Sequence, residues 1–204
     1  MKIAILGSGV VGQALARGWP RHGHEVRIGT RDGSKPELAD FETGSPAEVA
    51  GWGDLVVLAL HGDATEDVAR SVAAQLTGKV VVDATNPLDF SGGGPGLFIG
   101  TTDSLGERVQ RAVPGAHVVK AYNTVGNALM VDPELPGGPP TMLIAGNDDD
   151  AKATVTRLLE ETGWDVADLG GIDASRWLEG VALAWVAYGF RTGSWTHAFK
   201  LLRT

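Results

Sequence analysis

A glycine-rich turn near the start of the chain carries the clearest chemical signal in the sequence. The pattern G-x-G-x-x-G directly follows an apolar run, Lys2–Leu6, and directly precedes a segment of helical period. In such a turn the first glycine permits the tight bend, the second lets the backbone approach a pyrophosphate, and the third lets helix and strand pack closely. The helix that follows points its free amides at the phosphates. The sequence therefore predicts a dinucleotide site at Gly7, Ser8, Gly9, Val10, Val11 and Gly12.

The residues after the second expected strand, Glu25–Gly29, predict which dinucleotide is bound. An NAD-binding fold usually carries an acid there, about 20 residues after the turn, for the ribose 2′-hydroxyl. This chain has Thr30 and Arg31 instead, with Lys35 close by. A hydroxyl and a guanidinium suit a 2′-phosphate, so we expect NADP in preference to NAD. Asp32 would repel that phosphate unless it turns away or caps the following turn, and the alternative is that Arg31 is only a solvated loop charge.

Polar side chains also follow three other expected strands. His61 comes after Leu60, Asn86 lies in a Thr-Asn-Pro turn, and Asn123 follows Tyr122. Because ligands of doubly wound sheets bind at the carboxyl ends of the strands, we expect these groups to face one crevice and to contact the cofactor. His61, Asn86 and Asn123 are the candidates for catalysis, although each also has a structural explanation. The chain has no Tyr-x-x-x-Lys pair, which argues against the short-chain dehydrogenase mechanism.

Short β-branched runs alternate with segments of helical period, which predicts a Rossmann-type α/β fold with a doubly wound, mostly parallel sheet. The expected strands are Lys2–Leu6, Glu25–Gly29, Leu55–Leu60, Val80–Asp83, Val118–Lys120, Thr141–Ala145 and Trp164–Leu169. The expected helices are Val10–His22, Pro46–Trp52, Asp63–Gln75, Asp103–Val113, a helix capped by Asn147 and ended by Gly163, and Asp173–Arg191. We expect residues 1–170 to form an NADP-binding domain and residues 171–204 a small C-terminal helical part. The last helix is apolar nearly all round, so we expect it to be buried in this chain or against another copy.

The composition excludes several classes of protein. Hydrophobic residues make up 43% and charged residues 21% of the 204 residues, as in an ordinary globular protein. A formal net charge of −8 lacks the positive field that binding a nucleic-acid backbone needs. The absence of cysteine removes disulfides, thiolate metal sites and cysteine nucleophiles. The longest apolar stretch, residues 181–190, is about half a membrane span. We expect a cytoplasmic protein without a metal, membrane or nucleic-acid partner.

Four segments occur together in this chain: ILGSGVVG at 5–12, GTR at 29–31, DATNP at 83–87 and VKAYNT at 119–124. The tail from residue 143 to residue 179 continues their pattern. In this combination the chain resembles the NADPH:coenzyme F420 oxidoreductases and the related reductase domain of the STEAP metalloreductases. The resemblance implies hydride transfer between NADPH and a deazaflavin or flavin ring, often in a homodimer. It implies that Ser8, Val10 and Val11 lie at the pyrophosphate, Thr30 and Arg31 at the 2′-phosphate, and Asn86 and Asn123 near the nicotinamide.

Two other functions stay open on the residues alone. One is a reductase of a small carbonyl or imine, which would need a proton donor such as His61 or Tyr122 in the crevice. The other is a non-enzymatic sensor that binds NADP. The Gly-rich loop Ser91–Gly100, with Phe98 at its far end, is expected to open and close over the crevice. Four residues near the end of the chain have no counterpart in the resemblance: Trp185, Tyr188, Trp195 and His197. For Trp185 and Tyr188, packing in the core is the plainer explanation.

Overall fold

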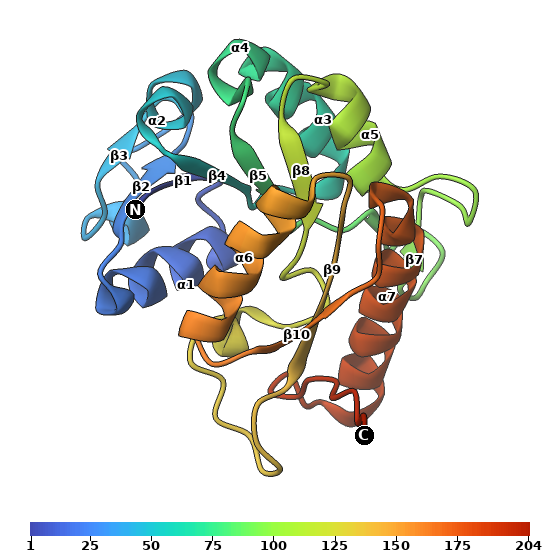
Figure 1. Cartoon of the computed structure of the whole chain (residues 1–204). Coiled ribbons are helices and arrows are strands. Elements are labelled where there is room, and N and C mark those ends of the chain that lie inside the picture. Colours follow the sequence, from blue (N-terminus) through green and yellow to red (C-terminus); the bar gives the residue numbers. More distant parts are fainter.

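The apolar runs of the sequence form one eight-stranded sheet in the computed structural model, which describes all residues, 1–204 (Figure 1). The strand order is β10-β9-β8-β5-β4-β1-β2-β3, and every neighbouring pair is parallel except β8 and β9. The bounds are β1 Lys2–Leu6, β2 Glu25–Gly29, β3 Thr43–Gly44, β4 Leu55–Leu58, β5 Val80–Asp83, β8 His117–Lys120, β9 Thr141–Gly146 and β10 Asp165–Asp168. A separate antiparallel hairpin joins β6 Leu88–Asp89 to β7 Gly96–Leu97. The predicted Rossmann-type fold is confirmed.

Helices cover both faces of the sheet because successive residues of each strand point to opposite sides. In β1, Ile3 and Ile5 belong to the core on one face, and Ala4 and Leu6 to the core on the other. Helices α1 (Val10–Gly18) and α6 (Asp149–Glu161) cover the first face. The second face is covered by α2 (Pro46–Trp52), α3 (Gly62–Ser71), α4 (Ala73–Leu76) and α5 (Leu105–Ala112) (Figure 1).

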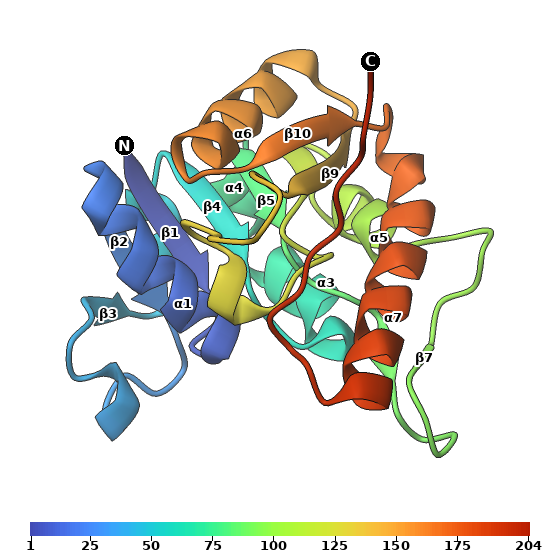
Figure 2. The same cartoon turned by 90° about the horizontal axis from the view of Figure 1, so that it is seen from below.

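The order of the strands creates a switch point at β1. Its neighbours are β2 and β4, and the helices that follow β1 and β4 lie on opposite faces. At such a point the two connections diverge and leave a crevice at the carboxyl ends of the strands. Figure 2 shows the ends of β1 and β4 reaching the same edge of the sheet as the far end of the last helix.

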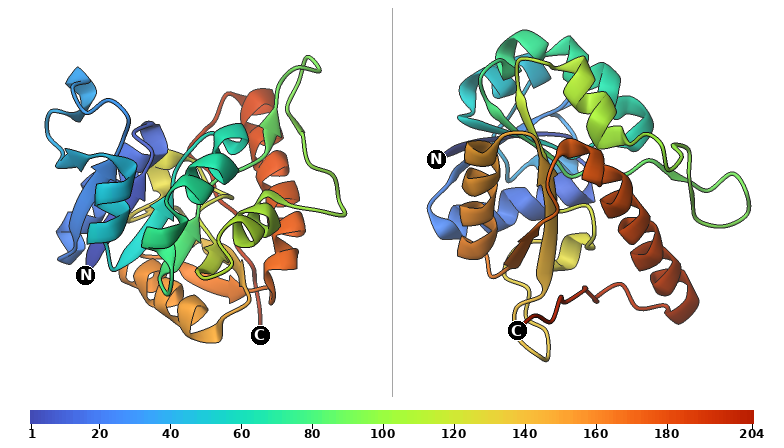
Figure 3. Two further views of the ribbon diagram at one scale, coloured as in Figure 1. Left: turned by 90° about the horizontal axis from the view of Figure 1, so that it is seen from above. Right: turned by 45° about the vertical axis from the view of Figure 1, so that its right-hand side comes forward.

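The chain ends with α7 (Ser175–Thr192) and an extended tail. One side of α7 is buried against β9 and α5, whereas Trp177, Tyr188 and Phe190 are exposed. The tail turns back alongside the start of β9, where the Thr141 amide donates to the Phe199 carbonyl at 2.9 Å (Figure 3). The expectation of a helix buried all round is therefore wrong within the chain. No helix is both long and apolar enough to cross a lipid bilayer.

Several predicted boundaries differ from those observed. The first helix ends at Gly18 and continues as a 3-10 turn, and the third breaks at Val72 into α3 and α4. Asp148, and not Asn147, caps α6, because its carboxylate accepts from the Ala151 amide at 2.8 Å. The short strands β3, β6 and β7 were not predicted, since runs of two residues carry no periodicity.

Candidate active site

The fold requires a glycine at two of the three glycine positions in the predicted phosphate turn, but not at the third. Gly7 has φ +128°, and a Cβ on it would lie 2.0 Å from the Ala59 carbonyl oxygen. A Cβ on Gly12 would lie 2.0 Å from the Gly7 carbonyl oxygen. The fold itself therefore requires these two glycines. Gly9 has an ordinary φ of −75°, and a Cβ there would have nothing of this chain within 4 Å. The protein's own packing gives no reason for a glycine at that position.

The start of α1 is open as well. Gly9 is its N-cap and offers no side chain, and the first helical hydrogen bond runs from the Gln13 amide to the Gly9 carbonyl. The amides of the first turn thus have no acceptor within the helix, as at any helix N-terminus. No acidic side chain lies in that turn, and the Val10 side chain is 68% exposed. The turn offers unpaired donors, the positive end of a helix and an exposed apolar surface.

The end of β2 is joined to this turn and carries free positive charge. Ser8 Oγ and Thr30 Oγ1 lie 3.2 Å apart, so the two segments meet. Asp32 accepts from the amide and hydroxyl of Ser34, at 3.0 and 2.6 Å, and these hydrogen bonds lower its pKa. Asp32 therefore caps the following turn, which is one of the two arrangements in which we expect it not to repel a 2′-phosphate. The carboxylate is occupied within the loop and is not paired with Arg31.

Most cationic side chains of the protein have a partner. Of the 17 lysines and arginines, 14 make a hydrogen bond, an ion pair or a contact with an aromatic ring. The three without one are Arg31, Lys35 and Arg191. Two of these three therefore lie in one exposed loop beside the open turn. That loop can receive an anionic group without breaking any contact of the free protein.

Asn86 and Asn123 form a reciprocal pair across the ends of β5 and β8. Asn86 Nδ2 donates to the Asn123 backbone carbonyl at 2.8 Å, so Asn86 Oδ1 is left to accept from Asn123 Nδ2 at 3.0 Å. Because a carbonyl can only accept, it fixes the orientation of both amides. Asn123 Oδ1 then has no hydrogen-bond partner, although the residue is only 4% exposed. A buried acceptor without a donor indicates a missing N–H or O–H group at this point.

Leu60 and His61 follow β4, which ends at Leu58 and not at the predicted Leu60, and His61 is the N-cap residue of α3. The His61 side chain is exposed and makes no hydrogen bond, while its carbonyl accepts from Thr65 Oγ1 at 2.8 Å. A Cβ on the following Gly62 would lie 2.3 Å from the Asn86 carbonyl oxygen. This close approach of two backbones brings His61 and Asn86 to the same part of the crevice.

Tyr122 does not face the crevice. Its backbone has φ +62°, and its side chain is completely buried, edge-on to Trp19 with 5.8 Å between the ring centroids. Burial raises the pKa of the phenol. The suggestion that Tyr122 donates a proton to a substrate is therefore wrong. The sequence places the residue at a strand end but does not show that the positive φ turns its side chain under the sheet.

Aromatic residues of α7 and the tail pack against the connection that follows Asn123. Trp185 is buried as expected, and its Nε1 donates to the His197 carbonyl at 2.7 Å. A Cβ on Gly126 would lie 2.7 Å from the Trp185 ring. Tyr188 is 54% exposed, so core packing does not explain it. Phe190 joins this cluster to Phe90, at the base of the Ser91–Gly100 loop, with 5.9 Å between the ring centroids.

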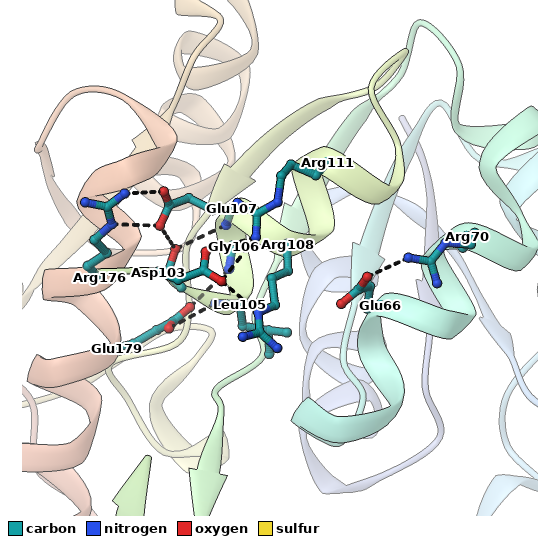
Figure 4. A network of polar contacts seen from close by, with 11 residues as sticks. Glu66, Arg70, Asp103, Leu105, Gly106, Glu107, Arg108, Arg111, Arg176 and Glu179 are labelled. Atoms are coloured by element: carbon teal, nitrogen blue, oxygen red, sulfur yellow. Dashed lines mark hydrogen bonds and ion pairs between the residues drawn. The ribbon is translucent and has the colours of Figure 1, made fainter. Parts of the chain in front are cut away.

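A buried group of charges beneath the crevice was not predicted. Lys120 lies between Asp83 and Glu179, with its Nζ 2.9 Å from a carboxylate oxygen of each. Figure 4 shows the neighbouring polar contacts between α5 and α7, in which Glu179 accepts from the amides of Leu105 and Gly106, and Arg176 pairs with Glu107. The one available signal was that Asp83 and Lys120 each end a run of buried valines.

Comparison with known proteins agrees with this geometry. Residues 2–87 match the model of a family described as NADP oxidoreductase, coenzyme F420-dependent. The F420-dependent NADP reductase of Methanothermobacter marburgensis is 32% identical, with 88% of both chains covered. That of Methanocaldococcus jannaschii is 30% identical over 89% of both chains. A crystal structure of a candidate F420-dependent NADP-reductase from Arthrobacter sp. FB24 is 41% identical, covers both chains completely and has a TM-score of 0.93.

More distant relatives share parts of this likeness. The rat metalloreductase STEAP3 is 28% identical over 89% of this chain, which corresponds to 36% of the rat protein. An imine reductase from Streptomyces aurantiacus has the same fold at 16% identity and a TM-score of 0.67. At least 30% identity along nearly the full length of two curated relatives decides the assignment, and the chain belongs to the F420-dependent NADP reductases, a family of oxidoreductases.

Proposed function

We propose that this protein binds NADP(H) in the crevice and exchanges a hydride between it and a deazaflavin of the coenzyme F420 type. The observation that carries the proposal is the pair of unpartnered cations, Arg31 and Lys35, beside a turn whose central glycine has no packing role. A 2′-phosphate between these cations and a pyrophosphate above Gly9 would use both features. The printed names of the relatives, F420-dependent NADP reductase, support the same cofactor and second substrate.

The fit of the dinucleotide follows from groups that the free protein leaves open. The amides at the start of α1 would hold the pyrophosphate, because they lack acceptors and the helix dipole favours an anion there. Thr30, Arg31 and Lys35 would hold the 2′-phosphate. Asn123 Oδ1, the buried acceptor without a donor, would receive the carboxamide N–H of the nicotinamide, with Asn86 fixing its orientation. Leu60 and His61 would border the same ring.

The chemistry requires little more than position from the chain. When bound, NADPH supplies the hydride from its nicotinamide ring. The residues bind the dinucleotide at its phosphates, orient the carboxamide and keep water from the face where the second ring lies. The Ser91–Gly100 loop and the aromatic residues of α7 and the tail are the segments that can cover this face. His61, an exposed side chain in the same part of the crevice as Asn86, stays a candidate for contact with the reacting rings.

Reduction of a small carbonyl or imine is less well supported. That chemistry needs a proton donor in the crevice, and because Tyr122 is buried only one of the two expected donors, His61, is left there. A flavin in place of the deazaflavin fits the same geometry, since both are flat tricyclic rings. For a sensor without enzymatic activity we find no favouring contact or surface.

An assay with NADPH against coenzyme F420, FMN and a panel of carbonyls and imines tests the proposal. We expect turnover with the deazaflavin in both directions and none with the panel, while the rate with FMN shows whether a flavin also serves as the second ring. Turnover limited to a carbonyl or imine would refute the deazaflavin proposal. NADPH binding without turnover on any acceptor would favour the sensor.

We also propose that residues 171–204 act as a C-terminal helical part through which two copies of the chain associate in the cytoplasm. The exposed side of α7 carries Trp177 and Tyr188, which are 63% and 54% exposed and lie eleven residues apart, on the same face of the helix. Large apolar side chains exposed on one helix favour an interface. Light scattering should give the mass of a dimer for the wild type and that of a monomer for Trp177→Glu. A wild-type monomer would refute this part of the proposal.

A further inference from the structure

We propose that the buried charge cluster Asp83–Lys120–Glu179 is a positioning device through which α7 sets the Asn86–Asn123 pair at the nicotinamide end of the crevice. The proposal rests on the proposed function and adds a role for three residues that have no contact with the dinucleotide's phosphate end. The cluster satisfies its own charges, it joins elements that are distant in the sequence, and its two strand residues lead directly to the amide pair.

The cluster satisfies its own charges in the interior. Lys120 and Asp83 are fully buried, and Glu179 is 2% exposed. All four carboxylate oxygens have donors: Asp83 Oδ1 accepts from the amide and hydroxyl of Thr85, and Asp83 Oδ2 from Lys120. Glu179 Oε1 accepts from Lys120 and from the Gly106 amide, and Oε2 from the Leu105 amide. Burial would lower the pKa of Lys120, but the two carboxylates outweigh burial and raise it, so the lysine stays charged.

The cluster joins elements that are far apart along the chain. Asp83 ends β5, Lys120 ends β8 in register with it, and Glu179 lies in α7. Glu179 also binds the first amides of α5, where the positive end of the helix stabilises a carboxylate (Figure 4). Displacement of α7 would therefore break contacts to two strands and a helix together.

Each strand residue of the cluster is coupled to one asparagine. From Asp83 the chain reaches Asn86 in three residues, and the Asp83 carboxylate holds the intervening Thr85 by two hydrogen bonds of 3.0 and 2.6 Å. From Lys120 it reaches Asn123 in three residues. There the Ala121 amide donates to the Asp83 carbonyl at 3.2 Å, and the Tyr122 amide to Met142 Sδ at 3.2 Å. The first connection is therefore held by the Asp83 carboxylate, and the second by the backbone of Asp83 and by Met142.

A buried ion pair is weak evidence for stability, because well-packed apolar residues often serve as well. A group of charges that spans three elements does define their geometry, since each hydrogen bond has a narrow range of distance and angle. The arrangement suits a site in which a small displacement of the nicotinamide would slow hydride transfer strongly.

The test compares Glu179→Gln with a matched control on the same helix. Arg176→Gln removes the α7–α5 ion pair to Glu107 but leaves Asp83 and Lys120 untouched. Tm, kcat with coenzyme F420 and the deuterium isotope effect with NADPH deuterated at the transferred position are measured on the full chain. The affinities for NADPH and for adenosine 2′,5′-bisphosphate are measured on the same protein. The bisphosphate lacks the nicotinamide, so it reports the phosphate end alone.

For Glu179→Gln we expect kcat to fall at least tenfold, the isotope effect to rise, and the bisphosphate affinity to stay within twofold. The preference for NADPH over the bisphosphate should fall several-fold. For Arg176→Gln we expect a lower Tm with kcat within twofold of the wild type. If Glu179→Gln lowers Tm but leaves kcat, the isotope effect and the NADPH preference at wild-type values, the cluster is structural only and the proposal is overturned.

A second variant covers the case in which Glu179→Gln does not fold. Asp83→Asn and Lys120→Met combined with Glu179→Gln removes all three charges together, so no buried charge is left unpaired. The amide oxygen at position 179 can still accept from the α5 amides, so the helices stay docked while their ionic link to the strands is lost. We expect the same fall in kcat, and wild-type kcat in this variant overturns the proposal. The preference for NADPH over the bisphosphate is a ratio of two binding affinities, so its measurement requires no hydride acceptor. A wild type inactive with F420 would therefore refute the proposed function while this preference still tests the positioning role.

Discussion

Two regions of the molecule differ in how their polar groups are paired: the ends of β1 and β2, and the ends of β5 and β8 together with α7. At β1 and β2 the helix amides, Arg31 and Lys35 have no partners within the chain. In the second region, Lys120 and both of its carboxylates are buried and fully paired. Polar groups without partners at the surface are available to a ligand. Buried polar groups whose hydrogen bonds are all made within the chain fix the positions of the elements that carry them. The Asn86–Asn123 pair lies between the two regions and combines them, with one free acceptor on a fixed support.

The largest expected effect breaks the paired region. Lys120→Ala leaves two buried carboxylates without their cation, and removal of one partner from a buried ion pair costs about 3–5 kcal/mol. Urea unfolding followed by circular dichroism measures the loss. Arg31→Ala, in the open region, should leave the free energy of unfolding unchanged, because that side chain has no partner in the free protein. A loss below about 1 kcal/mol for Lys120→Ala would contradict this view of the cluster.

The next effect belongs to the open region. Arg31→Ala should weaken NADPH binding by about 1.5–3 kcal/mol, the range of a hydrogen bond to a charged group. NADH, which lacks the 2′-phosphate, should bind almost as before. Fluorescence titration with both dinucleotides measures the difference. Equal losses of affinity for NADPH and NADH, or tighter binding of NADH by the wild type, would show that this loop does not bind the 2′-phosphate.

The turn offers a substitution that separates binding from folding. Gly9→Ala adds a methyl group that meets nothing of the protein, at an unstrained φ, so unfolding should be unchanged. NADPH affinity should fall at least tenfold, about 1.4 kcal/mol, because the methyl occupies the path of the pyrophosphate. Gly12→Ala is the contrast, since its Cβ would meet the Gly7 carbonyl and destabilise the fold itself. An unaltered NADPH affinity in Gly9→Ala would show that the motif is only a turn.

The open region was predictable from the sequence because its signals are local. The turn, the strand before it and the residues after β2 are each recognised within a few positions, and the observed β1 and β2 have the predicted bounds. The paired region was not predictable in the same way. Glu179 meets Lys120 only because α7 packs against α5 and the sheet, and no spacing in the sequence records that contact. The direction of the Tyr122 side chain likewise depends on a single backbone angle.

Acid should weaken the contact between α5 and α7. Hydrogen bonds from Arg176 lower the pKa of Glu107 below its ordinary value of 4.5. A carboxyl group with a lowered folded pKa contributes stability above its unfolded pKa and loses it as the pH falls through the folded one. Glu107→Gln should therefore cost about 1 kcal/mol at pH 7, and the difference from the wild type should shrink as the pH falls below 4.5. A difference that does not change with pH would show that the ion pair contributes nothing.

The smallest expected effect on binding concerns the Ser91–Gly100 loop, which lies beside α7. Gly92, Gly93 and Gly94 have open space around them, and the base of the loop is held to α7 by the contact between Phe90 and Phe190. Closure of the loop would exclude water from the second ring during transfer, whereas the phosphates of the dinucleotide lie at the other side of the crevice. Deletion of the three glycines should therefore depress turnover with the deazaflavin yet change NADPH affinity by less than about 0.5 kcal/mol. Steady-state kinetics and NADPH titration on the same variant separate the two effects. Unchanged turnover would reduce the loop to a connection, and the aromatic residues of the tail would be left as the cover of the crevice.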